Sequence, residues 1–160
     1  MSINASIDIK LVKYRQLGKS EYDIPVVEIF KILLSLGWNP NINGSMSFFP
    51  IGDDHDYDCT DRDFNYEYLL GIIEKKEKLK ETIGISMRWK ETDITVFFFF
   101  YTKDRLDGQI LLSLDASRPI LFELSEWHRV TDVNWFLMRL LPAFKETDFS
   151  IEYFNYSEYK

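Results

Sequence analysis

Six aspartates give this chain its densest group of side chains able to do chemistry: Asp53, Asp54, Asp56, Asp58, Asp61 and Asp63. The second, third and fourth of them match positions 1, 3 and 5 of a twelve-residue calcium loop. Position 6 of that loop is Cys59 where a glycine is needed for the sharp turn, and position 12 is Asn65 where a bidentate glutamate is needed. The spacing therefore excludes an EF-hand.

Three interpretations of this acidic segment remain open. The first is a solvated loop whose last aspartates, Asp61 or Asp63, lie near the positive N-terminus of the helix that follows. The second is a looser metal site, which would make the chain a metal-dependent hydrolase centred on Asp53–Asp63 with His55 nearby. Catalytic carboxylates usually come from different rigid elements, however, whereas these are consecutive on one loop.

The third interpretation is a negative surface that binds a basic protein partner. Carboxylates that lie within a Debye length of one another steer a cationic surface, and interleaved aromatic side chains then anchor it. Residues 52–68 contain seven acidic residues against the single Arg62, a local charge of −6 in a chain of net charge −7. The predicted partner-binding residues are Asp53, Asp54, Asp56, Tyr57, Asp58, Asp61, Asp63 and Tyr66.

The sequence offers few side chains that could serve as a catalytic nucleophile or its base. Cys59 and His55 lie four residues apart, but nothing in this stretch holds a base rigidly against a nucleophile or supplies an oxyanion donor. His128, between Trp127 and Arg129, is typical of a structural hydrogen-bonding residue. The seven glycines are scattered singly, which excludes a P-loop or Rossmann phosphate site. We therefore expect no catalytic residue, no metal and no cofactor.

Length and composition set the protein class. A chain of 160 residues with 46% hydrophobic and 16% aromatic residues builds one substantial core, so we expect a single domain over residues 1–160. The acidic balance argues against direct nucleic-acid binding, which needs clustered Lys and Arg. The one cysteine excludes an internal disulfide. No apolar run has the length of a membrane span and no secretion signal opens the sequence, so a cytoplasmic location is expected, with no membrane partner.

Hydrophobic periodicity predicts alternating strands and helices in the first half of the chain. A strand is expected over residues 6–13, then a helix bracketed by Asp23, Pro25 and Gly37. A short strand over residues 45–51 and an exposed loop at 52–63 precede a helix over about 64–82, closed by Gly84.

The second half reads as an antiparallel meander over residues 84–124, because its turn signals are too close together for crossover helices. Thr131 or Asp132 caps the third helix, which Pro142 ends or kinks, and a last strand follows from Asp148. The run Phe97–Phe100 is apolar on both faces, which suits either a strand covered on both sides or one face used for binding.

Together these elements predict an α+β fold: a mostly antiparallel sheet of about six strands with about three helices packed on one face.

Three segments give the chain a recognisable overall character: GWNPNINGSMSFFPIGDDHDYD, ITVFFFF and TDVNWFLMRLLPAF. In that character the chain resembles the immunity proteins of bacterial polymorphic and contact-dependent growth inhibition toxin systems, which are small, acidic, aromatic-rich cytosolic α+β domains. The resemblance implies a non-catalytic toxin inhibitor whose partner is a cognate protein toxin, which in such families is often a basic nuclease. Its acidic, aromatic surface would cover the toxin's active site or substrate groove. A regulatory or adaptor domain remains a further alternative, and the oligomeric state stays open.

Overall fold

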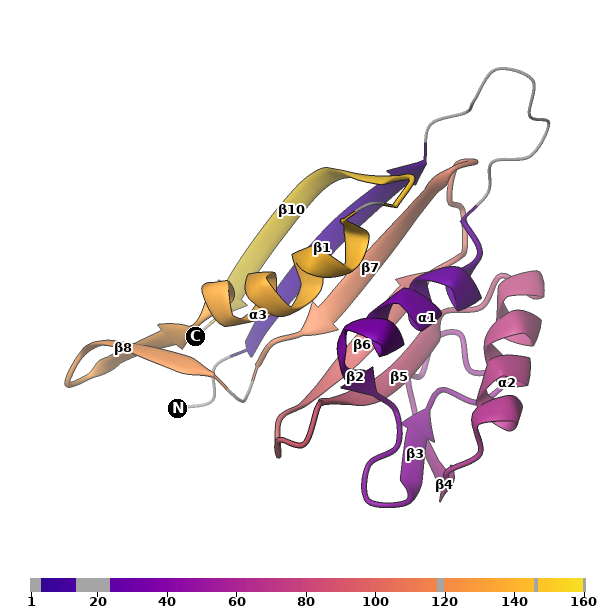
Figure 1. Ribbon diagram of the computed structural model, residues 1–160, viewed down its shortest axis with the longest axis horizontal. Coiled ribbons are helices and arrows are strands. Elements are labelled where there is room, and N and C mark those ends of the chain that lie inside the picture. Colours follow the sequence, from indigo (N-terminus) through magenta and orange to yellow (C-terminus); the bar gives the residue numbers. More distant parts are fainter. Residues whose placement is uncertain (1–3, 14–23, 118–119, 146, 160) are drawn as a thin grey trace.

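The computed structural model in Figure 1 describes residues 4–13, 24–117, 120–145 and 147–159. Strands and helices alternate in the first half, and strands dominate the second. The elements within the described residues are β1 (Asn4–Lys13), α1 (Val26–Leu36), β2 (Trp38–Asn39), β3 (Ser45–Phe48), β4 (Thr60–Asp63), α2 (Tyr66–Lys78), β5 (Ile83–Trp89), β6 (Thr95–Tyr101), β7 (Gln109–Asp115), β8 (Leu121–Ser125), β9 (His128–Thr131), α3 (Val133–Leu140), the 3-10 helix η1 (Leu141–Phe144) and β10 (Phe149–Tyr159).

One large sheet organises the molecule. Its strands follow the order β10-β1-β7-β6-β5-β3-β4, with β2 paired to β5, and every pairing is antiparallel. The predicted α+β class is confirmed, although the described residues form ten strands rather than about six. The unforeseen strands β2, β4 and β9 span two to four residues, too few for an alternating pattern to be recognised.

The three helices cover one face of this sheet, as predicted. Alternate residues of the central strands and the inner stripes of all three helices belong to a single buried cluster. Its fully buried members include Ile7, Ile9, Leu11, Phe30, Leu33, Leu69, Ile73, Phe98, Phe100, Leu112, Leu114, Phe136 and Leu140. Because strand residues alternate between faces, the residues between them lie on the opposite face, which we call the second face.

Local signals place the helix ends. Pro25 is the N-cap residue of α1, and Gly37 follows its last turn at φ 133°, while Asp23 lies outside the described residues. Asn65 caps α2 by accepting a hydrogen bond from the Tyr68 backbone N–H. The expected end of this helix at residue 82 is wrong, because it stops at Lys78 and Lys80 then takes a left-handed backbone at φ 57°.

The third helix follows its predicted boundaries. Asp132 is the cap, and its carboxylate accepts the Trp135 backbone N–H at 3.1 Å. Pro142 has no N–H to continue the α-helical ladder, so α3 ends at Leu140 and the chain passes into η1.

The predicted meander is wrong at its last strand. We expected the segment PILFEL to continue the meander after QILLSLD, but among the described residues β8 pairs with β9 alone, in a separate two-stranded sheet. The reason is that β1 already occupies the free edge of β7 along the register Ser6 to Asp115 through Val12 to Gln109. The β8–β9 hairpin therefore projects from the end of the molecule (Figure 1).

The aromatic run of β6 is covered on both sides. Phe98 and Phe100 lie in the core, whereas Phe97 and Phe99 are half-buried on the second face beneath Phe49. The first of the two explanations for this run therefore holds for these residues. Within the described part of the chain, no helix is long and apolar enough to cross a bilayer.

Candidate partner-binding surface

A buried lysine fixes the start of the acidic segment, residues 53–63. Lys76 on α2 is 0% exposed, and its Nζ donates to the carbonyl oxygens of Pro50 and Asp53 at 2.8 and 2.9 Å. The same Nζ lies 3.4 Å from Glu81, whose carboxylate also accepts the Gly52 backbone N–H at 2.8 Å. Burying a charge is costly unless it is fully partnered, so this arrangement ties the segment firmly to α2.

Two of the six aspartates are committed to shaping the loop itself. Asp53 accepts the backbone N–H groups of Tyr57 and Asp58 at 2.9 and 2.6 Å, which holds Tyr57 in a left-handed conformation at φ 54°. Asp54 accepts the Thr82 N–H at 3.1 Å, and its other oxygen faces Lys103 at 3.8 Å. These two carboxylates are therefore structural: Asp53 binds the backbone of the loop itself, and Asp54 binds the loop to Thr82.

Aromatic stacking holds the middle of the segment on the second face. The Tyr57 ring stacks on Phe49 with centroids 5.1 Å apart and an interplanar angle of 13°, and it meets Phe99 edge-on at 6.1 Å. Phe49 in turn lies 5.1 Å from Phe97. Gly84 leaves room for this ring, since a Cβ there would come within 2.4 Å of Phe49. Tyr57 nevertheless keeps 44% of its surface exposed.

The remaining four aspartates point into solvent. Asp56 and Asp58 are exposed on the loop, and Asp61 and Asp63 are exposed on β4, the outermost strand of the sheet. Asp61 and Asp63 stand opposite Ser47 and Ser45, so they share the second face with them. Among the described residues, no cation lies within ion-pair distance of these four carboxylates.

The two tyrosines after β4 do not pack beside the exposed aspartates. Tyr66 opens α2, packs on the core and stacks with Phe30 at 6.5 Å, so the structure separates it from the exposed carboxylates. Tyr68 lies beneath the Arg62 guanidinium at 4.1 Å from its ring centroid. Of the eight predicted partner-binding residues, the structure therefore groups Tyr57 and the four exposed aspartates as the accessible set.

The thiol of this segment is poorly suited to catalysis. Partial desolvation raises the pKa of Cys59, and the charges of Asp61, Asp53 and Asp58 raise it further against the opposing hydrogen bond with Ser47. A raised pKa lowers the thiolate fraction at neutral pH, the opposite of what a nucleophile needs. His55 is exposed and lies 3.7 Å from Asp54. No three His, Cys, Asp or Glu side chains converge on a metal-binding geometry in the described part of the chain.

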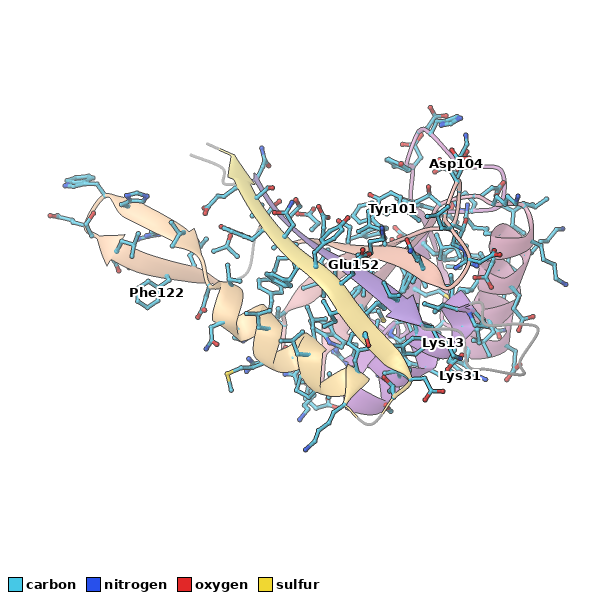
Figure 2. The ribbon with its side chains drawn as sticks, turned by 90° about the horizontal axis from the view of Figure 1, so that it is seen from above. Lys13, Lys31, Tyr101, Asp104, Phe122 and Glu152 are labelled. Atoms are coloured by element: carbon cyan, nitrogen blue, oxygen red, sulfur yellow. The ribbon has the colours of Figure 1, made fainter. Side chains whose placement is uncertain are left out.

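A second exposed surface was not foreseen from the sequence. The β8–β9 hairpin, residues 121–131, carries Phe122, Leu124 and Trp127 at exposed fractions of 55%, 59% and 89%. We call it the apolar arm; Figure 2 shows Phe122 on it, beyond the end of the helical layer. The apolar segment PILFEL predicts a strand but does not reveal that the strand leaves the sheet. Only the pairing of β1 with β7 makes that visible.

Comparison with known proteins adds no relative: no protein-family model matches the chain, and no curated protein or solved structure shows significant similarity to it.

Proposed function

We propose that this protein is a non-catalytic immunity protein that binds a cognate toxin through the exposed carboxylates of its acidic segment. The observation that supports this is that some residues of the segment hold its backbone in place while others are left exposed. Asp53, Asp54 and Lys76 fix the backbone, and this leaves Asp56, Asp58, Asp61 and Asp63 on a preorganised surface.

Preorganisation matters because an ordered loop loses less conformational entropy when a partner binds. Neighbouring carboxylates that pair with no cation among the described residues attract a cationic surface over about a Debye length, roughly 8 to 10 Å at physiological salt. Tyr57, half-exposed and stacked on Phe49, supplies a rigid aromatic contact beside them. The surface therefore suits a basic protein better than a small molecule, and the cognate toxin would be blocked at the basic groove that binds its substrate.

The test is co-expression with the product of the reading frame immediately upstream, followed by co-purification and a toxicity assay. We expect a stable complex and protection of cells that express that product. Absence of both a complex and protection would overturn the proposal.

The role of the acidic segment is tested separately with Asp56→Asn, Asp58→Asn, Asp61→Asn and Asp63→Asn combined. The association rate should fall about tenfold at low salt, and its dependence on ionic strength should flatten, because steering is lost. The control, Glu91→Gln with Asp93→Asn, removes two exposed acidic charges from the β5–β6 turn and should leave the rate near that of the unmodified chain. Equal rates for all three proteins would remove the segment from the interface.

A further inference from the structure

One carboxylate of the second face lies next to the aromatic strand β6. A row of directly opposed residues crosses the sheet there, with Asp8 on β1, Ser113 on β7 and Phe99 on β6. Directly opposed residues share a face, so all three lie on the side of the sheet opposite the helices. Tyr101, two residues after Phe99, is on the same side, and Figure 2 shows it away from α3. We call Asp8, Phe99, Tyr101 and Ser113 the Asp8 site.

The Asp8 carboxylate has no cation of its own within the described part of the chain. It is half-buried and accepts a hydrogen bond from the Ser113 hydroxyl, and no described Lys, Arg or His lies within ion-pair distance of it. Lys10, two residues along the same face, pairs with Glu152 on β10 at 3.3 Å instead. An ionised carboxylate accepts about four hydrogen bonds, so Asp8 keeps acceptor positions open to a donor that approaches from solvent.

The aromatic rings beside Asp8 belong to a packed row. Tyr101 stacks on Phe99 with centroids 6.3 Å apart and an interplanar angle of 6°, and Tyr57 meets the same Phe99 ring edge-on at 6.1 Å. Burial raises the pKa of Tyr101, and the neighbouring Tyr57 and Asp8 raise it further against the hydrogen bond with Ser113. Tyr101 therefore lies within electrostatic reach of both. Through Tyr57 the Asp8 site is continuous with the accessible part of the acidic segment.

We infer that the Asp8 site receives an arginine side chain of the bound toxin, an inference that rests on the function proposed above. The guanidinium would donate to the open acceptor positions of Asp8 and lie against the ring of Tyr101. Arginine suits this site because its planar group pairs with a carboxylate through two hydrogen bonds and also stacks on aromatic rings. A lysine ammonium is a compact point charge and does not stack in this way.

The charge of the surrounding face favours a basic occupant. Asp115, two residues from Ser113 on β7, adds an exposed carboxylate opposite Phe97 on the same face. The positive charge of Lys10 is already matched by Glu152. The local excess is therefore negative, and it has the same sign as the acidic segment that Tyr57 connects to it.

The Asp8 site and the acidic segment should act at different stages of binding. Exposed charges at the rim of an interface mainly change the association rate, whereas loss of one partner of a desolvated charge pair mainly changes the dissociation rate. The four exposed aspartates of the acidic segment are of the first kind. Asp8 is already half-buried, and a bound toxin would cover it further, so its pairing with an arginine is of the second kind.

The first experiment measures surface plasmon resonance between the full chain and the product of the upstream reading frame. Asp8→Asn should raise the dissociation rate at least about 30-fold and leave the association rate within about twofold. The amide is isosteric and still accepts the Ser113 hydrogen bond, so the fold is preserved. The control, Glu74→Gln, removes one exposed negative charge from α2 on the helical side and should leave both rates unchanged.

A second pair of variants tests the ring. Tyr101→Leu should raise the dissociation rate about tenfold, because the cation loses its aromatic contact. Tyr101→Phe keeps the ring and removes only the hydroxyl, so the dissociation rate should stay within about threefold of that of the unmodified chain. Equal effects of the two variants would overturn the role of the ring.

A peptide titration tests the site without the toxin. Acetyl-Gly-Arg-Gly-amide, added to the isotopically labelled full chain, should shift the backbone amide signals of Asp8, Ser113 and Tyr101, with a Kd on the order of 10 mM. Acetyl-Gly-Lys-Gly-amide should bind several-fold more weakly, and Asp8→Asn should abolish the shifts.

The outcomes separate this inference from the proposed function. A complex that dissociates at an unchanged rate in Asp8→Asn would overturn the inference while the proposed function stands. Peptide shifts that persist in Asp8→Asn, or equal binding of the two peptides, would overturn it as well. Absence of any complex with the unmodified chain would overturn the proposed function and, with it, the inference.

Discussion

The acidic segment and the apolar arm are both exposed, yet the molecule holds them in opposite ways. The acidic segment is polar at its surface and is anchored from beneath by the buried Lys76 and by stacking on Phe49. The apolar arm is apolar at its surface and joins the rest of the chain near Thr131 and Asp132. Two surfaces of similar exposure can therefore be held in very different ways, and the residues beneath each surface decide how firmly it is held. The two regions should respond differently to substitution.

The largest effect is expected at Lys76. Lys76→Met removes the donor to Pro50 and Asp53 and leaves the Glu81 carboxylate without its cation, so the free energy of unfolding should fall by about 3 kcal/mol. Urea denaturation monitored by circular dichroism measures this. Lys75→Met, at the exposed neighbouring position, should change stability by less than about 0.5 kcal/mol. A loss no greater at position 76 than at 75 would show that the anchor is dispensable.

The next effect is expected beneath the Tyr57 ring. Gly84→Ala places a Cβ 2.4 Å from Phe49 and 2.7 Å from Phe97, so these rings must shift, at about 2 kcal/mol of stability. Gly71→Ala is the control, because it lies in α2 with nothing within 4 Å of the new Cβ. Helix propensity should make that variant more stable by about 0.5 to 1 kcal/mol. Thermal denaturation should give opposite signs for the two, and equal signs would contradict the packing described here.

A smaller effect concerns Cys59 in the acidic segment. Its raised pKa lowers the thiolate fraction, so iodoacetamide should react more slowly at neutral pH with the folded chain than with the chain in urea. The rate should rise with pH, with a midpoint above that of the unfolded thiol. Asp58→Asn with Asp61→Asn should accelerate the folded reaction a few-fold, because nearby carboxylates disfavour the thiolate. If the pH midpoint of the reaction in the folded chain were at or below that in the unfolded chain, the pKa of Cys59 would not be raised by folding.

The smallest effect is expected on the arm. Trp127 is 89% exposed, so Trp127→Ser should change the stability of the monomer by less than about 0.5 kcal/mol when it is measured at low protein concentration. A loss comparable to that of Lys76→Met would mean that the arm is anchored as firmly as the acidic segment, and the contrast between the two regions would disappear.

Local patterns predicted much of the fold. The alternation of Ile7, Ile9 and Leu11 predicted β1, and Asp132 and Pro142 marked the limits of α3. These signals succeeded because each depends on neighbouring residues, through side-chain period, capping or a missing N–H. The acidic segment was likewise visible from composition alone.

Features that depend on contacts between distant parts of the chain could not be predicted from local patterns. Gly84 looked like a helix stop, but it lies in β5, and its missing side chain makes room for Phe49 from a distant part of the chain. The sequence around Asp53 does not show that its carboxylate accepts hydrogen bonds from the loop backbone. Nor does it show that Lys76, from α2, is buried beneath the loop. The apolar arm was missed for the same reason, since β1 excludes β8 from the sheet.

The position of β1 has a consequence for how the chain folds. This strand pairs with β7 on one side and with β10 on the other, so residues 4 and 159 become neighbours. During synthesis β1 can dock on β7 only after most of the chain has emerged, and its outer edge stays unpaired until β10 follows. Such non-local pairing slows folding and prolongs the exposure of a strand edge. Of the described strands, the one latest in the sequence is therefore the one that pairs with the earliest.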